Sequence, residues 1–280
     1  MSPRTADRPL PEGLGLSHEL LPLAWRVARR AGDLLHQGRH DELAVDTKTT
    51  RTDVVTQMDR ASEKLIVTQI LAERPEDGLL GEEGAAREGT TGVRWVVDPL
   101  DGTVNYLYGL PSWAVSVAAE VDGVATVGVV DVPVLGETFV GVRGQGARWI
   151  RGDAITTPVP NSPRSLSQCL VATGFGYAAE RRVAQAQSLT QILPKVRDIR
   201  RPGAAAVDLC WVAAGLVDAY FERGLQPWDS AAAVLVAREV GLSVGGPPGE
   251  DPSGELTWVA PAHLAEEFAA LIHGAGAHRD

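Results

Sequence analysis

The sequence places two carboxylates three positions apart at the end of a short apolar run, in the segment Asp98-Pro99-Leu100-Asp101. The preceding valines and tryptophan are typical of a buried strand, and Pro99 favours an extended Asp98. A buried carboxylate without a partner is costly, so a hard divalent cation such as Mg²⁺, which prefers oxygen ligands, accounts for both acids. Gly102 allows a close turn, and its N–H group and that of Thr103 can hold a phosphate oxygen. The segment therefore predicts a metal and phosphate site at the tip of a strand.

The same residues have a plainer interpretation, an Asp-Pro turn followed by an Asp-Gly turn. A second pair of acids argues against it, because Glu82 and Glu83 stand between glycines directly after Leu79-Leu80. Such a pair usually lies in a solvated loop. Gly81, however, stands where a short strand would end, which predicts that Glu82 points inward.

A third acidic centre lies in the second half of the chain, in Trp228-Asp229-Ser230-Ala231. The ordinary role of an acid at the start of a helix is that of an N-cap. Asp229 nevertheless comes soon after a predicted strand that ends on another carboxylate, Glu222. The loop 200–205 supplies a glycine and small residues at another helix start, which suits the close approach of a ligand to the backbone.

Composition narrows the functional classes. The 280 residues are 44% hydrophobic and 22% charged, which leaves room for one large domain or two lobes with a sizeable core. The net charge of -10 and the pI of about 5.1 argue against nonspecific binding to nucleic acid or to an anionic membrane. They do not exclude an anionic substrate, because a metal ion inverts the local charge.

The two cysteines, Cys169 and Cys210, show neither metal-ligand spacing nor a disulfide framework. Each lies in an apolar run, which predicts buried free thiols and fits a reducing cytoplasm. The N-terminus lacks an apolar signal core, and no apolar stretch is long enough to span a bilayer. A cytoplasmic protein without a membrane partner is therefore expected.

In the first half of the chain, helices are expected to pack on an antiparallel sheet. Ser17 is the predicted N-cap of a first helix. Thr56 and Asp59 form a variant capping box that opens a second helix, which ends near Arg74. Asp122-Gly123 between two β-branched runs predicts a hairpin. Strands are expected at about 43–45, 79–81, 93–97, 113–121, 124–132, 136–142 and 147–150.

The second half alternates strands with helices, which is typical of an α/β unit. Strands are expected at 170–173, 196–200, 217–221 and 257–260, and helices at 179–193, 204–215, 230–240 and 262–272. A proline-rich stretch at 156–163 is the best candidate for a boundary. The predicted organisation is a flexible tail at 1–16, a metal-binding lobe at 17–157 and a lobe at 158–280 that completes the active site.

Three segments together resemble the signature motifs of the inositol monophosphatase family: Gly81-Glu82-Glu83, Trp95-Val96-Val97-Asp98-Pro99-Leu100-Asp101-Gly102-Thr103-Val104-Asn105, and Trp228-Asp229-Ser230-Ala231-Ala232. The similarity extends from about Ser17 to Ile272. It implies an α+β fold, a layered αβαβα sandwich of the sugar-phosphatase type, with an antiparallel sheet in the N-terminal lobe and an α/β C-terminal lobe. It also implies Mg²⁺-dependent, Li⁺-sensitive hydrolysis of a phosphate monoester, with inositol monophosphate as the leading substrate.

The resemblance further implies roles for individual residues. Two or three Mg²⁺ ions are expected per site, the first on Glu82, Asp98 and the Leu100 carbonyl and the second on Asp98, Asp101 and Asp229. Thr103, hydrogen-bonded to Asp59, is expected to activate the attacking water, with Glu82 and Asp98 as further catalytic residues. Glu83 is expected to contact the metal ligands rather than the metals, and Lys48 is expected to pair with the acidic cluster. The expected substrate contacts are Glu82, Leu100, Asp101, Gly102, Thr103, Gly203, Ala204, Ala205, Glu222 and Asp229.

Two departures from the family pattern bear on substrate preference. Ala204 stands where relatives often carry Ser or Thr, and Leu242 replaces a frequent glycine. The exact ester therefore stays open, with histidinol phosphate, a sugar bisphosphate and a nucleotide 3′-phosphate as alternatives. A regulatory, protein-binding role on the same fold is another alternative. The resemblance implies a homodimer, and the charge argues against a nucleic-acid partner.

Overall fold

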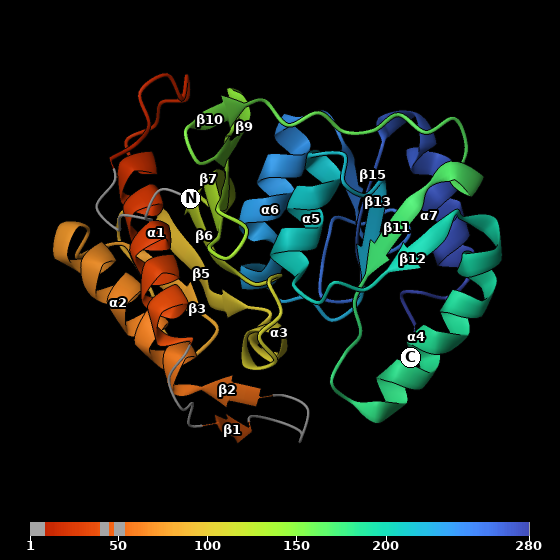
Figure 1. Ribbon diagram of the computed structural model, residues 1–280, viewed down its shortest axis with the longest axis horizontal. Coiled ribbons are helices and arrows are strands. Elements are labelled where there is room, and N and C mark those ends of the chain that lie inside the picture. Colours follow the sequence, from red (N-terminus) through yellow and green to blue (C-terminus); the bar gives the residue numbers. More distant parts are fainter. Residues whose placement is uncertain (1–8, 40–44, 48–53, 280) are drawn as a thin grey trace.

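The computed structural model describes residues 9–39, 45–47 and 54–279 and stacks helices and sheets in alternating layers (Figure 1). Helices α1 (Leu21–Gly38) and α2 (Gln57–Glu73) cover the outer face of a large sheet. Helices α5 (Ala205–Ala213) and α6 (Pro227–Glu239) lie between this sheet and a smaller one. Helices α4 (Ala179–Ile192) and α7 (Ala265–Gly274) cover the far face of the smaller sheet. This is the predicted α+β layered sandwich.

The large sheet has the strand order β10-β9-β8-β7-β6-β5-β3-β4. Its strands are β3 (Gly78–Gly81), β4 (Ala86–Arg87), β5 (Val93–Asp101), β6 (Ala114–Val121), β7 (Val124–Val132), β8 (Glu137–Val142), β9 (Gly146–Arg151) and β10 (Ala154–Thr156). A separate antiparallel pair joins β1 (Val45–Thr47) to β2 (Val54–Thr56). Residues 43 and 44 of the predicted 43–45 strand lie outside the described residues.

The sheet is antiparallel as predicted except at one place, where β3 and β5 pair in parallel. The intervening strand β4 turns back along β3 at the edge of the sheet. The loop after β4 then returns the chain to the starting end of β3, so that β5 runs in the same direction. A parallel pair needs such a connection, which a tight hairpin cannot supply. Both strands consequently end at the same edge.

Local signals explain most of the boundaries. The hairpin between β6 and β7 turns on Asp122 (φ 51°) and Gly123 (φ 78°), as the Asp-Gly pair predicts. The capping box at the start of α2 is confirmed by reciprocal hydrogen bonds between Thr56 and Asp59. The N-cap prediction for Ser17 is wrong. Helix α1 begins only at Leu21 and has no side-chain cap, and the backbone N–H of Ser17, outside the helix, donates to Oε1 of Gln145 at 2.9 Å.

The smaller sheet has the order β12-β11-β13-β15-β14. Its strands are β11 (Leu170–Thr173), β12 (Asp198–Arg200), β13 (Ala219–Glu222), β14 (Ser243–Gly245) and β15 (Thr257–Ala260). Strand β11 pairs in parallel with β12 and β13, whereas β15 pairs antiparallel with β13 and β14. The alternation of strands and helices is confirmed, with β14 as an additional strand. The predicted helix 262–272 is a 3₁₀ turn at Ala262–Leu264 followed by α7.

Helix α6 lies unusually close to the large sheet because glycines face it. A Cβ added at Gly128 of β7 would lie 2.7 Å from the Ala232 carbonyl oxygen, and one at Gly141 of β8 would lie 3.2 Å from the Val236 nitrogen. Ala232 and Val236 are fully buried there. Side chains larger than glycine would force the helix outward, and repacking of this kind costs about 1–3 kcal/mol. The close packing sets the position of α6 against the large sheet, and Asp229 in its first turn is positioned with it.

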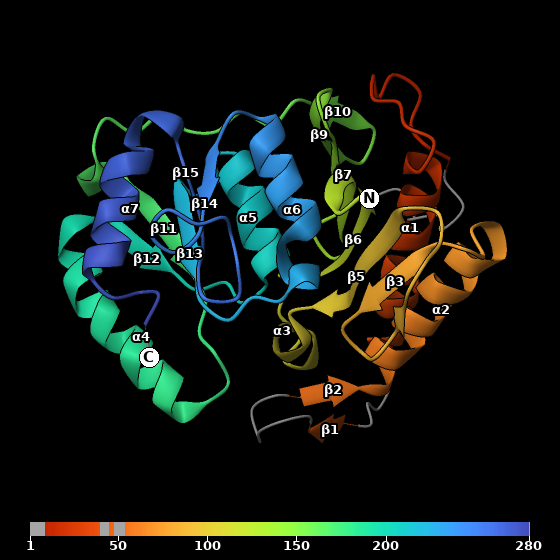
Figure 2. The same cartoon turned by 180° about the vertical axis from the view of Figure 1, so that it is seen from behind.

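The two sheets lie side by side with α5 and α6 between them in both views (Figures 1 and 2). The predicted division at residues 157–158 falls just after β10, and it stays a prediction, as does the tail at 1–16. Leu14 and Leu16 of that segment are buried in the core that α1 shares with the large sheet. Within the described ranges, every helix is too short or too polar to cross a lipid bilayer.

Candidate active site

The parallel pairing of β3 and β5 brings the first two acidic motifs together. Gly81 lies opposite Val97 in the register, so the next residues, Glu82 and Asp98, lie side by side where the pairing of β3 with β5 ends. The backbone N–H of Glu82 donates to the Val97 carbonyl at 3.3 Å and extends the pairing by one residue. Asp98 is only 2% exposed. The prediction that Glu82 points inward agrees with this placement, because its side chain is hydrogen-bonded to Asp98.

Strand β5 changes register between Asp98 and Asp101, which lets both acids of one strand serve the same site. In a regular strand, residues three apart point to opposite faces. The carboxylate of Asp98 accepts the N–H of Leu100 at 3.0 Å and so stabilises the irregular turn. Burial, together with the charges of Glu82, Asp101 and Asp229, raises the pKa of Asp98 well above its ordinary value.

Asp101 links the large sheet to helix α5. Its two oxygens accept the backbone N–H groups of Ala205 at 3.1 Å and Ala206 at 2.7 Å, the first residues of that helix. Burial raises the pKa of Asp101 to about 7, although these hydrogen bonds oppose the effect. The sequence analysis assigns Asp101 to metal and substrate, and its capping of α5 is an additional function that only the structure reveals.

Asp229 approaches the same acids from helix α6. It occupies the third position of the helix, so the alternative that it is the N-cap is wrong; Gln226 has that place. Its Oδ2 accepts the N–H of Gln226 at 2.7 Å. Burial, despite this hydrogen bond, raises the pKa of Asp229 well above its usual range, and the charges of Asp101 and Glu82 add to the rise.

Glu82, Asp98, Asp101 and Asp229 thus form one acidic cluster, contributed by β3, β5 and α6. All its donors are carboxylate oxygens, the ligand type that Mg²⁺ and other hard cations prefer. The acids repel one another at Asp98, and a bound cation would relieve that repulsion. Within the described ranges, no three acidic, histidine or cysteine side chains are already placed as the ligands of one ion. The donor chemistry fits Mg²⁺, and binding would require these side chains to adjust.

Thr103 and Asp59 meet beside the cluster. The hydroxyl of Thr103 donates to Oδ1 of Asp59 at 2.9 Å and lies 3.2 Å from the Leu100 carbonyl. Oδ2 of Asp59 accepts the N–H of Thr56 at 2.8 Å and its hydroxyl at 2.5 Å. Burial raises the pKa of Asp59, although the hydrogen bonds from Thr56 and Thr103 oppose the rise. The predicted contact between Thr103 and Asp59 is therefore present.

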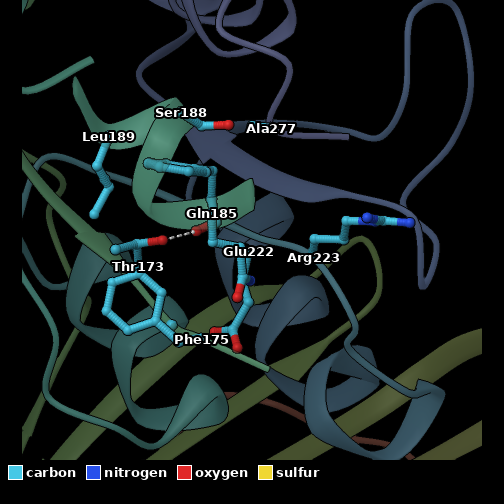
Figure 3. Close-up of a pocket in the computed structure, with 10 residues that line it drawn as sticks. Thr173, Phe175, Gln185, Ser188, Leu189, Glu222, Arg223 and Ala277 are labelled. Atoms are coloured by element: carbon cyan, nitrogen blue, oxygen red, sulfur yellow. Dashed lines mark hydrogen bonds between the residues drawn. The ribbon is translucent and has the colours of Figure 1, made fainter. Parts of the chain in front are cut away.

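Glu222 lies at the end of β13, across the site from the large sheet. The hydroxyl of Tyr220 donates to its Oε2 at 2.5 Å. Its carboxylate fills the space that a side chain at Gly174 would need, so a larger residue there would displace it. Figure 3 shows Glu222 and Arg223 extending in different directions from consecutive positions. The carboxylate of Glu222 therefore has a defined orientation.

A cavity of about 550 Å³ joins these groups. It is lined by eight of the predicted site residues: Glu82, Asp101, Gly102, Gly203, Ala204, Ala205, Glu222 and Asp229. Four others, Asp59, Asp98, Leu100 and Thr103, are buried directly behind this lining. Glu83 donates its N–H to Glu63 at 2.9 Å, and Lys48 lies outside the described residues.

The two departures noted in the sequence lie in different places. The Cβ of Ala204 is next to Gly102, where an added Cβ would approach it to 3.0 Å. A larger residue at position 204 would therefore meet the turn that follows Asp101. Leu242 is buried in the core shared by α5 and α6. Its position supports packing and does not line the cavity.

Sequence reasoning missed three buried polar residues that support the site. Glu63 accepts the N–H groups of Glu83 and Ala85 and holds the loop after β3. Ser62 donates to the Pro99 carbonyl at 2.8 Å. Asp208 of α5 is 1% exposed, and burial, reinforced by the charge of Asp101, raises its pKa well above the ordinary range. A polar residue on the inner stripe of a helix is the signal that could have identified them.

Known proteins resemble this chain over most of its length. Residues 17–276 match the model of the inositol monophosphatase family. An inositol-1-monophosphatase of Mycobacterium leprae is 45% identical over 236 residues, which cover 82% of this chain and 81% of that protein. Nus factor SuhB of Pasteurella multocida is 40% identical over 257 residues, which cover 90% and 92%.

Solved structures of similar proteins share this fold. The crystal structure of the extragenic suppressor protein suhB from Bartonella henselae has a TM-score of 0.83 and 33% identity, and the match covers 89% of this chain and 96% of that one. The shared fold, the extent of the matched residues and the acidic cluster all lead to one conclusion. The chain belongs to the inositol monophosphatase family.

Proposed function

We propose that this protein is a Mg²⁺-dependent phosphomonoesterase that hydrolyses inositol monophosphate to inositol and phosphate. The observation that carries the proposal is the convergence of Glu82, Asp98, Asp101 and Asp229 beside a large cavity, which all of them but Asp98 line. These acids come from three separate elements, and burial together with the charges of the other three raises the pKa of Asp98. A buried acidic cluster beside a cavity is a typical place for metal-assisted hydrolysis.

In this proposal, Glu82, Asp98 and the Leu100 carbonyl hold one Mg²⁺, and Asp98, Asp101 and Asp229 hold a second. Bound Mg²⁺ polarises the phosphoryl group, makes water more acidic and stabilises the leaving oxygen. The chain itself supplies position and orientation, which are the main protein contributions to phosphoryl transfer. The N–H groups of Gly102 and Thr103 are proposed to hold the phosphate.

Thr103 and Asp59 are proposed to orient the attacking water and to accept its proton. A hydroxyl has one hydrogen, and the shorter of the two contacts of Thr103 is that with Asp59. With its proton directed to Asp59, the oxygen of Thr103 is left to accept a hydrogen bond from water. Asp59 keeps this orientation because Thr56 holds its other oxygen.

Glu222 is proposed to accept hydroxyl groups of the polyol. A carboxylate can accept two neighbouring hydroxyls through its two oxygens. The hydroxyl of Tyr220 holds the carboxylate before the ligand arrives, and Gly174 leaves the space that the carboxylate occupies. Gly203, Ala204 and Ala205 line the same cavity without bulky side chains.

The test is phosphate release from a panel that includes inositol monophosphate, histidinol phosphate, a sugar bisphosphate and a nucleotide 3′-phosphate, with and without Mg²⁺. The proposal expects Mg²⁺-dependent release, fastest from inositol monophosphate. Release that is fastest from another ester would keep the chemistry and change the substrate. No release from any ester in the presence of Mg²⁺ would refute the proposal.

Three further properties belong to the same proposal. We expect inhibition by Li⁺, which competition between LiCl and Mg²⁺ at constant ionic strength can measure. We expect a homodimer, for which light scattering is the direct measurement. We also place the protein in the cytoplasm, since Cys169 and Cys210 are buried free thiols and such cysteines fit a reducing compartment.

A second function is favoured by the name of the Pasteurella relative, Nus factor SuhB. A protein-binding role of that kind would use the surface rather than the acidic cluster. It predicts a cellular phenotype that survives Asp98→Asn, whereas a phenotype due only to hydrolysis would be lost with that substitution.

A further inference from the structure

Asn105 is the last residue of the longest acidic motif, and the proposed function gives it no role. It is the third residue of the short helix α3 (Thr103–Leu107), which begins directly after Gly102. Its side chain is only 3% exposed and does not line the cavity. A buried amide is costly unless it is hydrogen-bonded, so the partners of Asn105 indicate its role.

The amide nitrogen of Asn105 donates to two backbone carbonyls. One is the carbonyl of Ser112, at 2.6 Å, in the loop before β6. The other is the carbonyl of Pro202, at 2.8 Å, in the loop between β12 and α5. A carbonyl can only accept, and an asparagine amide has two N–H groups, so both of them are used. The second contact spans 97 positions of the chain and joins the large-sheet part of the protein to the smaller-sheet part.

The loop that Asn105 reaches also packs directly on its side chain. A Cβ added at Gly203 would lie 3.2 Å from Nδ2 and 3.3 Å from Oδ1 of Asn105. Gly203 has a φ of +98°, a left-handed conformation that glycine adopts at little cost. Gly203 and its neighbour Ala204 line the cavity. Asn105 thus holds a segment of the cavity wall from behind.

A second anchor holds the other end of the same wall. The carboxylate of Asp101 accepts the N–H groups of Ala205 and Ala206, which follow Gly203 and Ala204 in the chain. Asp101 and Asn105 belong to one continuous motif, four positions apart. The position of the wall relative to the acids is therefore set on both sides of Gly203 and Ala204.

We propose that Asn105 is a positioning residue for the substrate, which holds the loop 202–204 where it meets the polyol part of the phosphate ester. This inference rests on the proposed function and assigns a task to a residue that touches neither substrate nor metal. The phosphate is proposed to lie at Gly102, Thr103 and the acids. Asn105 therefore governs binding of the polyol and leaves binding of the phosphate unchanged.

Asn105→Ala removes both donors and tests the proposal. With Mg²⁺, KM for inositol monophosphate, or for whichever ester is hydrolysed fastest, should rise about tenfold while kcat stays within about threefold of the wild type. Asn105→Asp keeps the size of the side chain but presents acceptors to two carbonyls, so it should raise KM at least as much. Inorganic phosphate, used as a competitive inhibitor, should keep its inhibition constant within about twofold in both variants.

The matched control is Asn161→Ala. The amide of Asn161 also donates twice, to the Gly215 carbonyl at 2.7 Å and to Oδ1 of Asp218 at 2.9 Å, but it does not line the cavity. This variant should keep the KM of the wild type. Circular dichroism and thermal melts establish that each variant is folded. An unchanged KM in folded Asn105→Ala, a wild-type KM in Asn105→Asp, or a rise in the inhibition constant of phosphate that equals the rise in KM would overturn the inference.

Gly203→Ala disturbs the same contact from the side of the loop. It should also raise KM, because the added Cβ crowds the amide of Asn105. In the double variant with Asn105→Ala that amide is absent, so KM should rise by less than the product of the two single effects. A rise equal to the product would show that Asn105 and the loop act independently, against the inference.

Hydrogen exchange separates this inference from the proposed function, because it needs no substrate. The backbone N–H groups of residues 203–206 should exchange at least about tenfold faster in Asn105→Ala than in the wild type or in Asn161→Ala. If no ester is hydrolysed, the proposed function fails, and faster exchange still supports the anchoring of the loop by Asn105. Unchanged exchange refutes that anchoring whether or not the protein is a phosphatase. Faster exchange with an unchanged KM would leave the phosphomonoesterase intact and refute the positioning of the substrate.

Discussion

The hydroxyl of Thr103 donates a hydrogen bond of 2.9 Å to Oδ1 of Asp59, and this contact joins the first turn of α2 to the first turn of α3 (Thr103–Leu107). Both residues are buried, and Thr56 occupies the other oxygen of Asp59. The pair therefore has one arrangement, in which the acid fixes the hydroxyl and the hydroxyl faces the acidic cluster. The first prediction concerns this pair.

Thr103→Ala and Asp59→Asn should each lower kcat about a hundredfold or more, the usual range for losing a group that handles the proton. Steady-state phosphate release measures the effect. The rival is a histidine base, which would make activity fall as pH drops through about 6.5. His263 and His273 contact the carbonyls of Pro163 and Gly246, away from Thr103. If His263→Ala or another histidine variant loses as much activity while folded, the assignment to Thr103 and Asp59 is wrong.

The second prediction concerns Asp98, which is proposed to contact both metal positions. Asp98→Asn should abolish turnover, because an amide lacks the charge that a hard cation needs. The fold should survive, since the pKa of Asp98 is already raised by burial and neighbouring acids and a neutral side chain removes repulsion there. Thermal melts provide a second readout: Mg²⁺ should stabilise the wild type by mass action and should stabilise the variant far less. Asp122→Asn, at an exposed hairpin turn, is the matched control. A folded Asp98→Asn protein with near-normal activity would contradict the proposal that Asp98 binds the metal ions.

The third prediction concerns Tyr220, which positions Glu222. Tyr220→Phe removes the hydroxyl that bonds Oε2 of Glu222 and leaves the ring in its buried place. A freer carboxylate should raise KM for a polyol phosphate several-fold with a smaller effect on kcat, because the hydroxyls of the substrate are bound less well. Glu222→Gln should show the same split. A fall in kcat without a change in KM would contradict a role in binding the polyol.

The fourth prediction concerns acid stability and Asp77, far from the proposed site. Burial acts to raise the pKa of Asp77, but hydrogen bonds from Arg74, Thr91 and Trp95 outweigh it and hold this pKa below the ordinary value of 3.8. A lowered folded-state pKa means that Asp77 contributes stability above the unfolded-state value and loses it as pH falls through the lower, folded-state value. Asp77→Asn should therefore lower the free energy of unfolding by about 2 kcal/mol at neutral pH. The difference should shrink toward pH 3.

Urea unfolding at several pH values makes this measurement. Glu76→Gln, at the exposed neighbouring position, is the control and should change stability little at any pH. A difference between Asp77→Asn and the wild type that stays constant from neutral to acidic pH would show that the charge of Asp77 is not what stabilises the fold.

The sequence alone determined the elements and the chemistry of the acids. Capping at Thr56 and Asp59 and the Asp-Gly turn depend on residues within a few positions of one another, so local patterns suffice to predict them. The order of the motifs also identified the family. Ser17 is not the N-cap, since α1 begins four residues later, and its backbone is bonded to a distant residue, Gln145, which a local window cannot show.

Tertiary structure decided which acids meet and what holds them. The parallel pairing of β3 with β5 sets Glu82 beside Asp98, and the N–H groups of α5 fix the carboxylate of Asp101. The carboxylate of Glu222 occupies space that Gly174, after β11, leaves free. Each of these relationships joins residues that are distant in the chain, and their geometry depends on how the sheets and helices pack. A residue's type can be read from the sequence, but its partner across the fold is set by that packing.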